Sequence, residues 1–103
     1  MNTKKTLAAI RDSVHQILPD AKVMLFGSRA NDTAHEESDW DILVIDKAPV
    51  DGVLKLSVRH HLYPLSLKLL AFFHTTVVSE DDWNNNPTYY SLRQSVLSNP
   101  HMS

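Results

Sequence analysis

The segment Asp41–Ile45 carries four consecutive apolar residues, Ile-Leu-Val-Ile, behind a single acid. Successive side chains of a strand point to opposite faces of a sheet, so this run gives both faces an apolar surface. A strand of that kind is stable in the centre of a sheet whose two faces are covered by other elements. The sequence therefore predicts a layered domain in which 41–45 is a central strand packed between helices.

Two other short segments are predicted to be strands. Lys22–Phe26 is an apolar run closed by Gly27, and Phe72–Val78 is rich in aromatic and β-branched residues. Helices are predicted over 3–17, 51–69, 79–83 and 88–97. This order of elements predicts an α/β (α+β) fold, in which a small mixed sheet of about three to four strands packs against helices and residues 1–103 form a single domain.

The helix boundaries are predicted from capping residues and helix breakers. Thr3 is expected to cap the first helix, Ser79 the third and Thr88 the last. Pro64 lies inside the second helical pattern and disfavours helical geometry at Tyr63, so we expect a kink or two shorter helices there.

Composition narrows the partners and the chemistry. The chain has 103 residues, which suits one domain, and its ten Lys and Arg against twelve Asp and Glu leave a net charge of −2. That balance provides no basic field for a nucleic-acid backbone, so a nucleic-acid partner is disfavoured. Without Cys the chain has no disulfide framework, no thiolate zinc site and no cysteine nucleophile.

No segment of the sequence suits a bilayer. Met1–Arg11 mixes charged and polar residues and lacks the apolar stretch of a signal peptide. The most apolar region, Leu62–Val78, is interrupted by Pro64, Lys68 and His74. We therefore expect no membrane partner and a cytoplasmic location.

Residues suited to phosphate binding follow the first predicted strand. Gly27 has no side chain, so a phosphate can approach its backbone closely. Ser28 and the N–H groups after it can donate hydrogen bonds, and a helix that began there would strengthen them. Arg29 could add a positive charge.

Two acids open the second predicted strand. Asp39 and Asp41 are two residues apart, so in a strand they would point the same way at about 6.5 to 7 Å, with Trp40 between them turned toward the core. Two carboxylates at that spacing can hold one Mg²⁺ or lie on either side of a metal pair. Mg²⁺ favours a few carboxylates combined with substrate phosphates over a closed protein cage.

The two elements together resemble a known family. Gly27-Ser28-Arg29, ten intervening residues from Ser28 to Asp39, and then Asp39-Trp40-Asp41 are similar to the signature of the minimal nucleotidyltransferases in the DNA polymerase β-like superfamily. The resemblance implies that Gly27 and Ser28 bind the triphosphate of a nucleotide and that Asp39 and Asp41 bind catalytic Mg²⁺. It also implies transfer of a nucleoside monophosphate, such as AMP from ATP, to a hydroxyl of a protein or small molecule, with release of pyrophosphate.

One departure from the family pattern affects the expected activity. Such enzymes usually carry a third carboxylate on the next strand, where this chain offers His74 and Thr76 as inward residues and no acid. The nearest acids, Glu80–Asp82, come after the strand. Neutral imidazole is a poor ligand for Mg²⁺, so the second ion of a two-ion site should be weakened. The alternative function is a catalytically impaired nucleotide-binding or antitoxin-type module.

The size of the chain bears on its partners. Few residues remain to bind an acceptor, so the acceptor is expected from a partner or from a second copy in a homodimer. The resemblance implies a helical HEPN protein, with this chain as the antitoxin of a toxin–antitoxin pair. His35 lies in the loop near the proposed metals, and Tyr89 and Tyr90 are expected to pack the last helix, with an acceptor or interface role left open.

Overall fold

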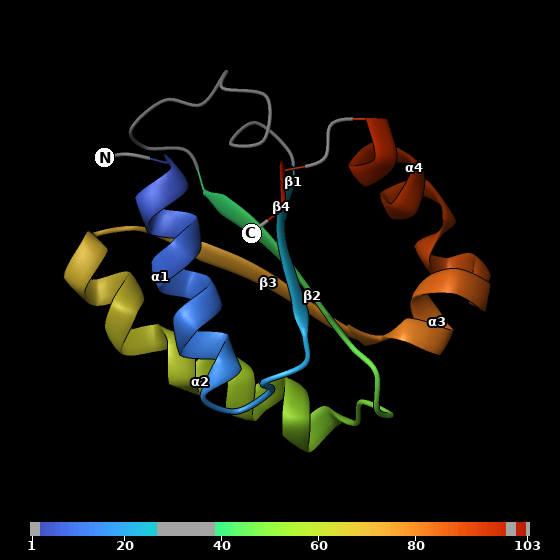
Figure 1. The fold of residues 1–103 in the computed structure, drawn as a ribbon, viewed down its shortest axis with the longest axis horizontal. Coiled ribbons are helices and arrows are strands. Elements are labelled where there is room, and N and C mark those ends of the chain that lie inside the picture. Colours follow the sequence, from blue (N-terminus) through green and yellow to red (C-terminus); the bar gives the residue numbers. More distant parts are fainter. Residues whose placement is uncertain (1–2, 27–38, 99–100, 103) are drawn as a thin grey trace.

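The computed structural model describes residues 3–26, 39–98 and 101–102, which form helices on both sides of one sheet (Figure 1). The elements, in chain order, are α1 (Thr3–His15), β1 (Lys22–Phe26), β2 (Trp40–Asp46), α2 (Gly52–Leu69), β3 (Phe73–Ser79), α3 (Glu80–Asn85), a 3₁₀ turn (Pro87–Tyr89), α4 (Tyr90–Ser98) and β4 (His101–Met102). The four strands lie in the order β3-β2-β1-β4. β1 pairs antiparallel with β2 and β4, and β2 pairs parallel with β3. The predicted mixed α/β (α+β) sheet is confirmed, with β2 inside it.

Both faces of β2 are buried, as its apolar run predicts. Trp40, Ile42 and Val44 lie in the larger core cluster with residues of α1 and α2. Leu43 and Ile45 lie in a second cluster with Trp83 of α3 and Val96 of α4. The alternation of side chains along one strand therefore joins two separate cores.

α2 corrects one sequence prediction. The sequence predicts a kink at Pro64 or two shorter helices. α2 is a single helix from Gly52 to Leu69 with Pro64 inside it, so the alternative of two shorter helices is wrong, and the kink stays a prediction. Pro64 is exposed, which leaves the carbonyl that has lost its N–H partner on the solvent side. Asp51 caps the start of the helix by accepting a hydrogen bond from the Leu54 N–H at 2.8 Å.

Two of the predicted caps are also wrong. α1 includes Thr3 as its first residue, so Thr3 does not precede the helix as a cap does. Ahead of α4, Asn86 caps a 3₁₀ turn by accepting from the Thr88 N–H at 3.0 Å, and α4 begins only at Tyr90. Pro87 suits the first position of such a turn, because its missing N–H has no partner to lose there. The predicted Ser79 cap is confirmed: its Oγ accepts from the Asp82 N–H at 3.1 Å.

Within the described ranges, none of the helices combines the length and apolarity needed to cross a bilayer.

Candidate functional site

The pairing of β2 with its two neighbours brings three chain segments to one end of the sheet. β2 and β3 start together, because the Trp40 N–H donates to the Phe72 carbonyl at 2.8 Å and Asp41 is the Cα partner of His74. β1 runs the other way and ends at Phe26, which is also opposite Asp41. The chain therefore leaves β1 beside the two acids that open β2.

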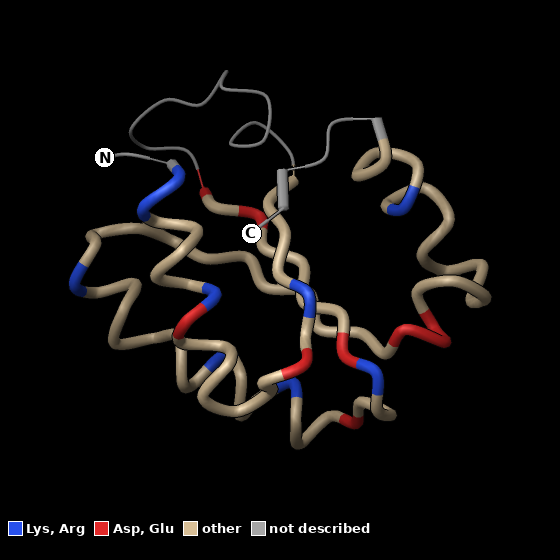
Figure 2. Tube along the Cα trace, viewed as in Figure 1, with Lys and Arg blue, Asp and Glu red and all other residues tan. Residues whose placement is uncertain are grey.

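Three polar side chains gather at this end of the sheet. His74 Nε2 lies 2.6 Å from Asp39 Oδ2, and both side chains are well exposed. Burial raises the pKa of the Asp41 carboxyl, while nearby His74 lowers this pKa and nearby Asp39 raises it. His74 is the partner of Asp41 in the parallel register, which puts the two side chains on one face of the sheet. The contact of His74 with Asp39 brings the Asp39 carboxylate to the same face. Figure 2 shows the acidic positions at the start of β2.

The residue between the two acids points the other way. Trp40 is 1% exposed and packs in the core on the α1 and α2 side, as the alternation along the strand predicts. The acids therefore lie on the face that is covered further along the sheet by α3 and α4.

All three residues predicted to bind phosphate lie outside the described residues. Gly27, Ser28 and Arg29 follow directly on Phe26, and His35 belongs to the same segment. Their binding roles, like the metal-binding roles of Asp39 and Asp41, stay predictions.

β3 carries His74 where the family resemblance implies a third carboxylate. β3 has no acid among its residues, and Glu80–Asp82 form the first turn of α3 at its far end. Glu80 comes six positions after His74, with the remaining residues of β3 between them, and six steps along a strand span roughly 20 Å. The acids of α3 are therefore too far away to take the place of His74.

The side chains present fit Mg²⁺ only with help from a ligand. Across the described ranges, no group of three or more His, Asp and Glu side chains is arranged to hold a metal ion. Asp39 and Asp41 supply the carboxylate oxygens that Mg²⁺ prefers, and Mg²⁺ commonly completes its shell with substrate phosphates and water. The pair fits an ion shared with a phosphate ligand and does not form a closed protein cage.

A family model described as a nucleotidyltransferase domain matches residues 7–88, most of the chain. The chain belongs to the nucleotidyltransferase domain family. The matched range includes β1, β2 and β3 of this nucleotidyltransferase domain, and with them both halves of the motif. The predicted membership of a nucleotidyltransferase family is therefore confirmed.

Solved structures share the fold of this nucleotidyltransferase domain. A toxin–antitoxin complex with AMP-PNP aligns over 99% of this chain and 72% of the matched chain, with 23% identity and a TM-score of 0.62. A complex of tri-AMPylated Shewanella oneidensis HEPN toxin with MNT antitoxin aligns over 98% and 71%, with 18% identity and a TM-score of 0.63. Cid1 with the UTP analogue UMPNPP aligns over 91% and 30%, with 20% identity and a TM-score of 0.51. Comparison with curated proteins gives no match.

Sequence reasoning placed His74 on the correct face but missed its contact with Asp39. The signal for that contact is the strand register, which composition and spacing do not contain.

The prediction that Tyr89 and Tyr90 pack the last helix is right for Tyr89 and wrong for Tyr90. Tyr89 packs on Trp83 with ring centroids 6.4 Å apart, whereas Tyr90 is mostly exposed below the Arg93 guanidinium.

Proposed function

We propose that this nucleotidyltransferase domain transfers AMP from ATP to a hydroxyl of a protein or small-molecule acceptor in a reaction that depends on Mg²⁺. The observation that carries the proposal is the shared face of Asp39 and Asp41, beside the end of β1 from which Gly27 and Ser28 follow. The neighbouring complexes support the choice of AMP and of a protein acceptor, since one contains AMP-PNP and another contains a tri-AMPylated HEPN toxin. A HEPN-type helical protein is accordingly the proposed partner.

The transfer makes one P–O bond and breaks another. The acceptor hydroxyl oxygen bonds to the α-phosphorus of ATP and gives up its proton to solvent, the bond from that phosphorus to the oxygen bridging to the β-phosphate breaks, and pyrophosphate leaves. Bound Mg²⁺ would neutralise phosphate charge and stabilise the attacking and leaving oxygens. Asp39 and Asp41 would hold it, and Gly27, Ser28 and Arg29 would bind the triphosphate.

His74 has a positioning role in this proposal. With its proton on Nε2, the imidazole donates to Asp39 Oδ2 and fixes the orientation of that carboxylate. The backbone of Asp41 is held by its pairing within β2.

Label transfer tests the proposal. The purified chain is incubated with ATP labelled at the α-phosphate, Mg²⁺ and, as the candidate acceptor, a purified HEPN-family protein such as the Shewanella oneidensis HEPN toxin, and label on that protein is measured. Asp39→Asn and Asp41→Asn should each abolish transfer. Asp12→Asn removes an exposed acid of α1 and should leave transfer unchanged. Transfer that survives both site substitutions would refute the role of these acids.

A second candidate function is a nucleotide-binding module that interacts with a toxin without transferring AMP. The absence of an acid from β3, with His74 in its place, favours this candidate. Calorimetric titration with AMP-PNP and Mg²⁺ separates the two functions: binding combined with no label transfer supports the module, and binding with transfer supports the enzyme.

A further inference from the structure

α2 has apolar residues on two opposite faces. One face packs on the core through Val58 and Leu62. The other face, with the residue that ends the helix, carries apolar side chains that are all more than half exposed in the described part of the chain. These side chains are Val53, Leu56, Tyr63, Leu67 and Leu70. A surface helix of a globular domain usually has one apolar stripe, so the second stripe calls for a partner.

The spacing of the exposed residues indicates which kind of partner. With His60 included, Val53, Leu56, His60, Tyr63 and Leu67 follow one another along α2 at alternating intervals of three and four residues. This is the heptad spacing by which one helix packs against another over several turns, and Leu70, the C-cap residue, adds an exposed side chain directly beyond the end of α2. We call these six residues the α2 stripe.

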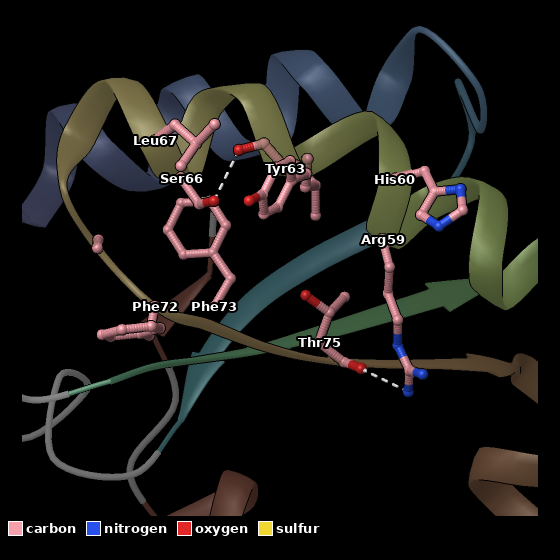
Figure 3. Close-up of a pocket in the computed structure, with 10 residues that line it drawn as sticks. Arg59, His60, Tyr63, Ser66, Leu67, Phe72, Phe73 and Thr75 are labelled. Atoms are coloured by element: carbon pink, nitrogen blue, oxygen red, sulfur yellow. Dashed lines mark hydrogen bonds between the residues drawn. The ribbon is translucent and has the colours of Figure 1, made fainter.

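A hollow lies beside the second half of the α2 stripe. It measures about 390 Å³ and lies between α2 and the start of β3 (Figure 3). Tyr63 and Leu67 line it from α2, and Phe72 and Phe73 line it from the other side. Such a hollow can receive a bulky apolar side chain from a docked helix, as a pocket at the centre of an interface does.

The neighbouring edge of the sheet favours a helix over a strand as the occupant. β3 is the edge strand on this side, and the Arg59 guanidinium donates to its Thr75 carbonyl at 3.4 Å. A cationic side chain across an edge strand opposes pairing with a further strand. Addition of a strand here would have to displace Arg59.

The positive charge of α2 indicates the charge of the helix that docks on it. The 52–69 helix contains Lys55, Arg59 and Lys68 and no acid, as Figure 2 shows. Arg59 is exposed beside the α2 stripe and lines the hollow, and Lys68 is exposed further round the same helix. A second copy would bring the same positive charges against this basic helix, which disfavours self-association through this face. The complementary helix carries carboxylates beside its apolar residues.

We propose that the α2 stripe and the adjoining hollow are a docking surface for an amphipathic helix of another protein, whose apolar heptad is flanked by Asp or Glu. The hollow lies on the Phe73 and Thr75 face of β3, opposite the face that holds His74 and the two acids. A docked helix therefore leaves the acids accessible. Assignment of that helix to the HEPN-type partner rests on the proposed function.

A synthetic helix tests the surface directly. The probe is a fluorescein-labelled 21-residue peptide with Leu at the heptad a and d positions and Glu at e and g. It is used at nanomolar concentration, and its anisotropy is followed as the full chain is added. The chain should bind it, and should bind a peptide with Lys at e and g about tenfold more weakly or worse.

Substitutions on the chain locate the binding. Leu56→Ser with Leu67→Ser should weaken binding of the Glu peptide about tenfold or more, while the fold is kept because both side chains are exposed. Leu97→Ser, on the exposed side of α4, is the matched control and should leave binding unchanged. Equal binding of the Glu and Lys peptides, or equal loss in the control, would overturn the proposal.

Two further measurements examine the other occupants. A dimer in sedimentation velocity that Leu56→Ser with Leu67→Ser abolishes would show that a second copy covers the α2 stripe. Binding to phosphatidylserine vesicles that the same substitutions abolish would show that the α2 stripe binds a membrane. Either result overturns the proposal, and a monomer that ignores vesicles and binds the Glu peptide supports it.

The peptide assay contains no nucleotide, so its failure does not bear on AMP transfer. Asp39→Asn, which should abolish transfer, should bind the peptide as the unmodified chain does. Capture of the HEPN-family protein that does not depend on Leu56 and Leu67 would overturn the assignment to that partner.

Discussion

At the residue scale, the site depends on how three polar side chains affect one another. Asp41 is half-buried at the start of the central strand, Asp39 is exposed ahead of it, and His74 reaches Asp39 from the next strand. An exposed ion pair adds little to stability, so the contact of His74 with Asp39 matters for the orientation of the carboxylate more than for the fold.

Asp41→Asn should stabilise the fold at neutral pH. Burial raises the pKa of Asp41 in the folded state above its unfolded value, so the folded chain binds the proton more tightly. This contribution to stability is fully present below the unfolded pKa and is lost as pH rises through the folded pKa. The ionised carboxylate of Asp41 therefore destabilises the folded state at pH 7. Asn carries no charge, so the substitution removes this destabilisation.

Thermal unfolding followed by circular dichroism checks this effect of Asp41→Asn. The melting temperature should rise at pH 7, and the gain should shrink toward pH 3, where Asp41 is protonated. Asp12→Asn controls for the loss of one negative charge at an exposed position. A lower melting temperature for Asp41→Asn at pH 7 would contradict the prediction.

His74→Asp should strengthen Mg²⁺ binding in the presence of AMP-PNP by about tenfold or more, because it places a third carboxylate beside the other two. Without metal the same substitution should lower the melting temperature, since three carboxylates repel one another. Calorimetry measures the Mg²⁺ affinity, with His74→Asn as the uncharged control. An Mg²⁺ affinity that is the same in both variants would contradict the prediction.

At the element scale, α2 serves both the fold and the proposed partner surface. It connects two parallel strands across one face of the sheet, as parallel strands require, and it remains one helix through Pro64. Proline inside a helix removes a backbone hydrogen bond and crowds the preceding turn. α2 persists because Val58 and Leu62, before the proline, are buried in the core and Leu65, after it, packs against the same core.

Pro64→Ala should therefore raise the free energy of unfolding by about 1–3 kcal/mol. The gain is the helix propensity of Ala over Pro, reduced by the greater freedom of the unfolded chain. Urea denaturation measures it, and Pro49→Ala, in the exposed loop before α2, should give no such gain. A lower free energy of unfolding for Pro64→Ala would contradict the prediction and would show that the packing of α2 depends on the proline.

Sequence patterns predicted the elements better than their ends. The apolar run of 41–45 was sufficient to identify the central strand, and the helical spacing through Val58 and Leu62 was sufficient to identify α2. Burial of apolar side chains decides the presence of both elements. The misplaced cap at Thr88 came from choosing among several residues able to cap within one turn. β4 was missed because two residues carry no periodicity, and its pairing with β1 is a long-range contact.

The candidate site could be predicted only in part. The spacing of Asp39 and Asp41 placed both carboxylates on one face, since alternation along a strand is local. The approach of His74 to Asp39 depends on the parallel register of β2 and β3, which tertiary packing sets.

At the scale of the whole molecule, two cores share one central strand. The larger cluster involves α1 and α2, and the smaller one joins Leu43, Ile45 and Val78 to α3 and α4. A domain of this size has about 5–15 kcal/mol of total stability, so neither cluster is dispensable.

Leu43→Ala should lower the free energy of unfolding by about 2–5 kcal/mol, because the fully buried side chain leaves a cavity in the smaller core. Leu97→Ala on the exposed side of α4 should change it by no more than about 0.5 kcal/mol. Both values come from urea denaturation. Similar losses in the two variants would contradict the burial of Leu43 in an essential core.

The two carboxylates sit where the most heavily packed strand begins. The backbone of Asp41 is held by pairing with strands on both sides, and Asp39 directly precedes the paired strand and contacts His74, so both acids take their positions when the protein folds. In the proposed function, an incoming nucleotide would therefore lose little affinity to ordering these groups, and such preorganisation favours tight binding from a small number of contacts.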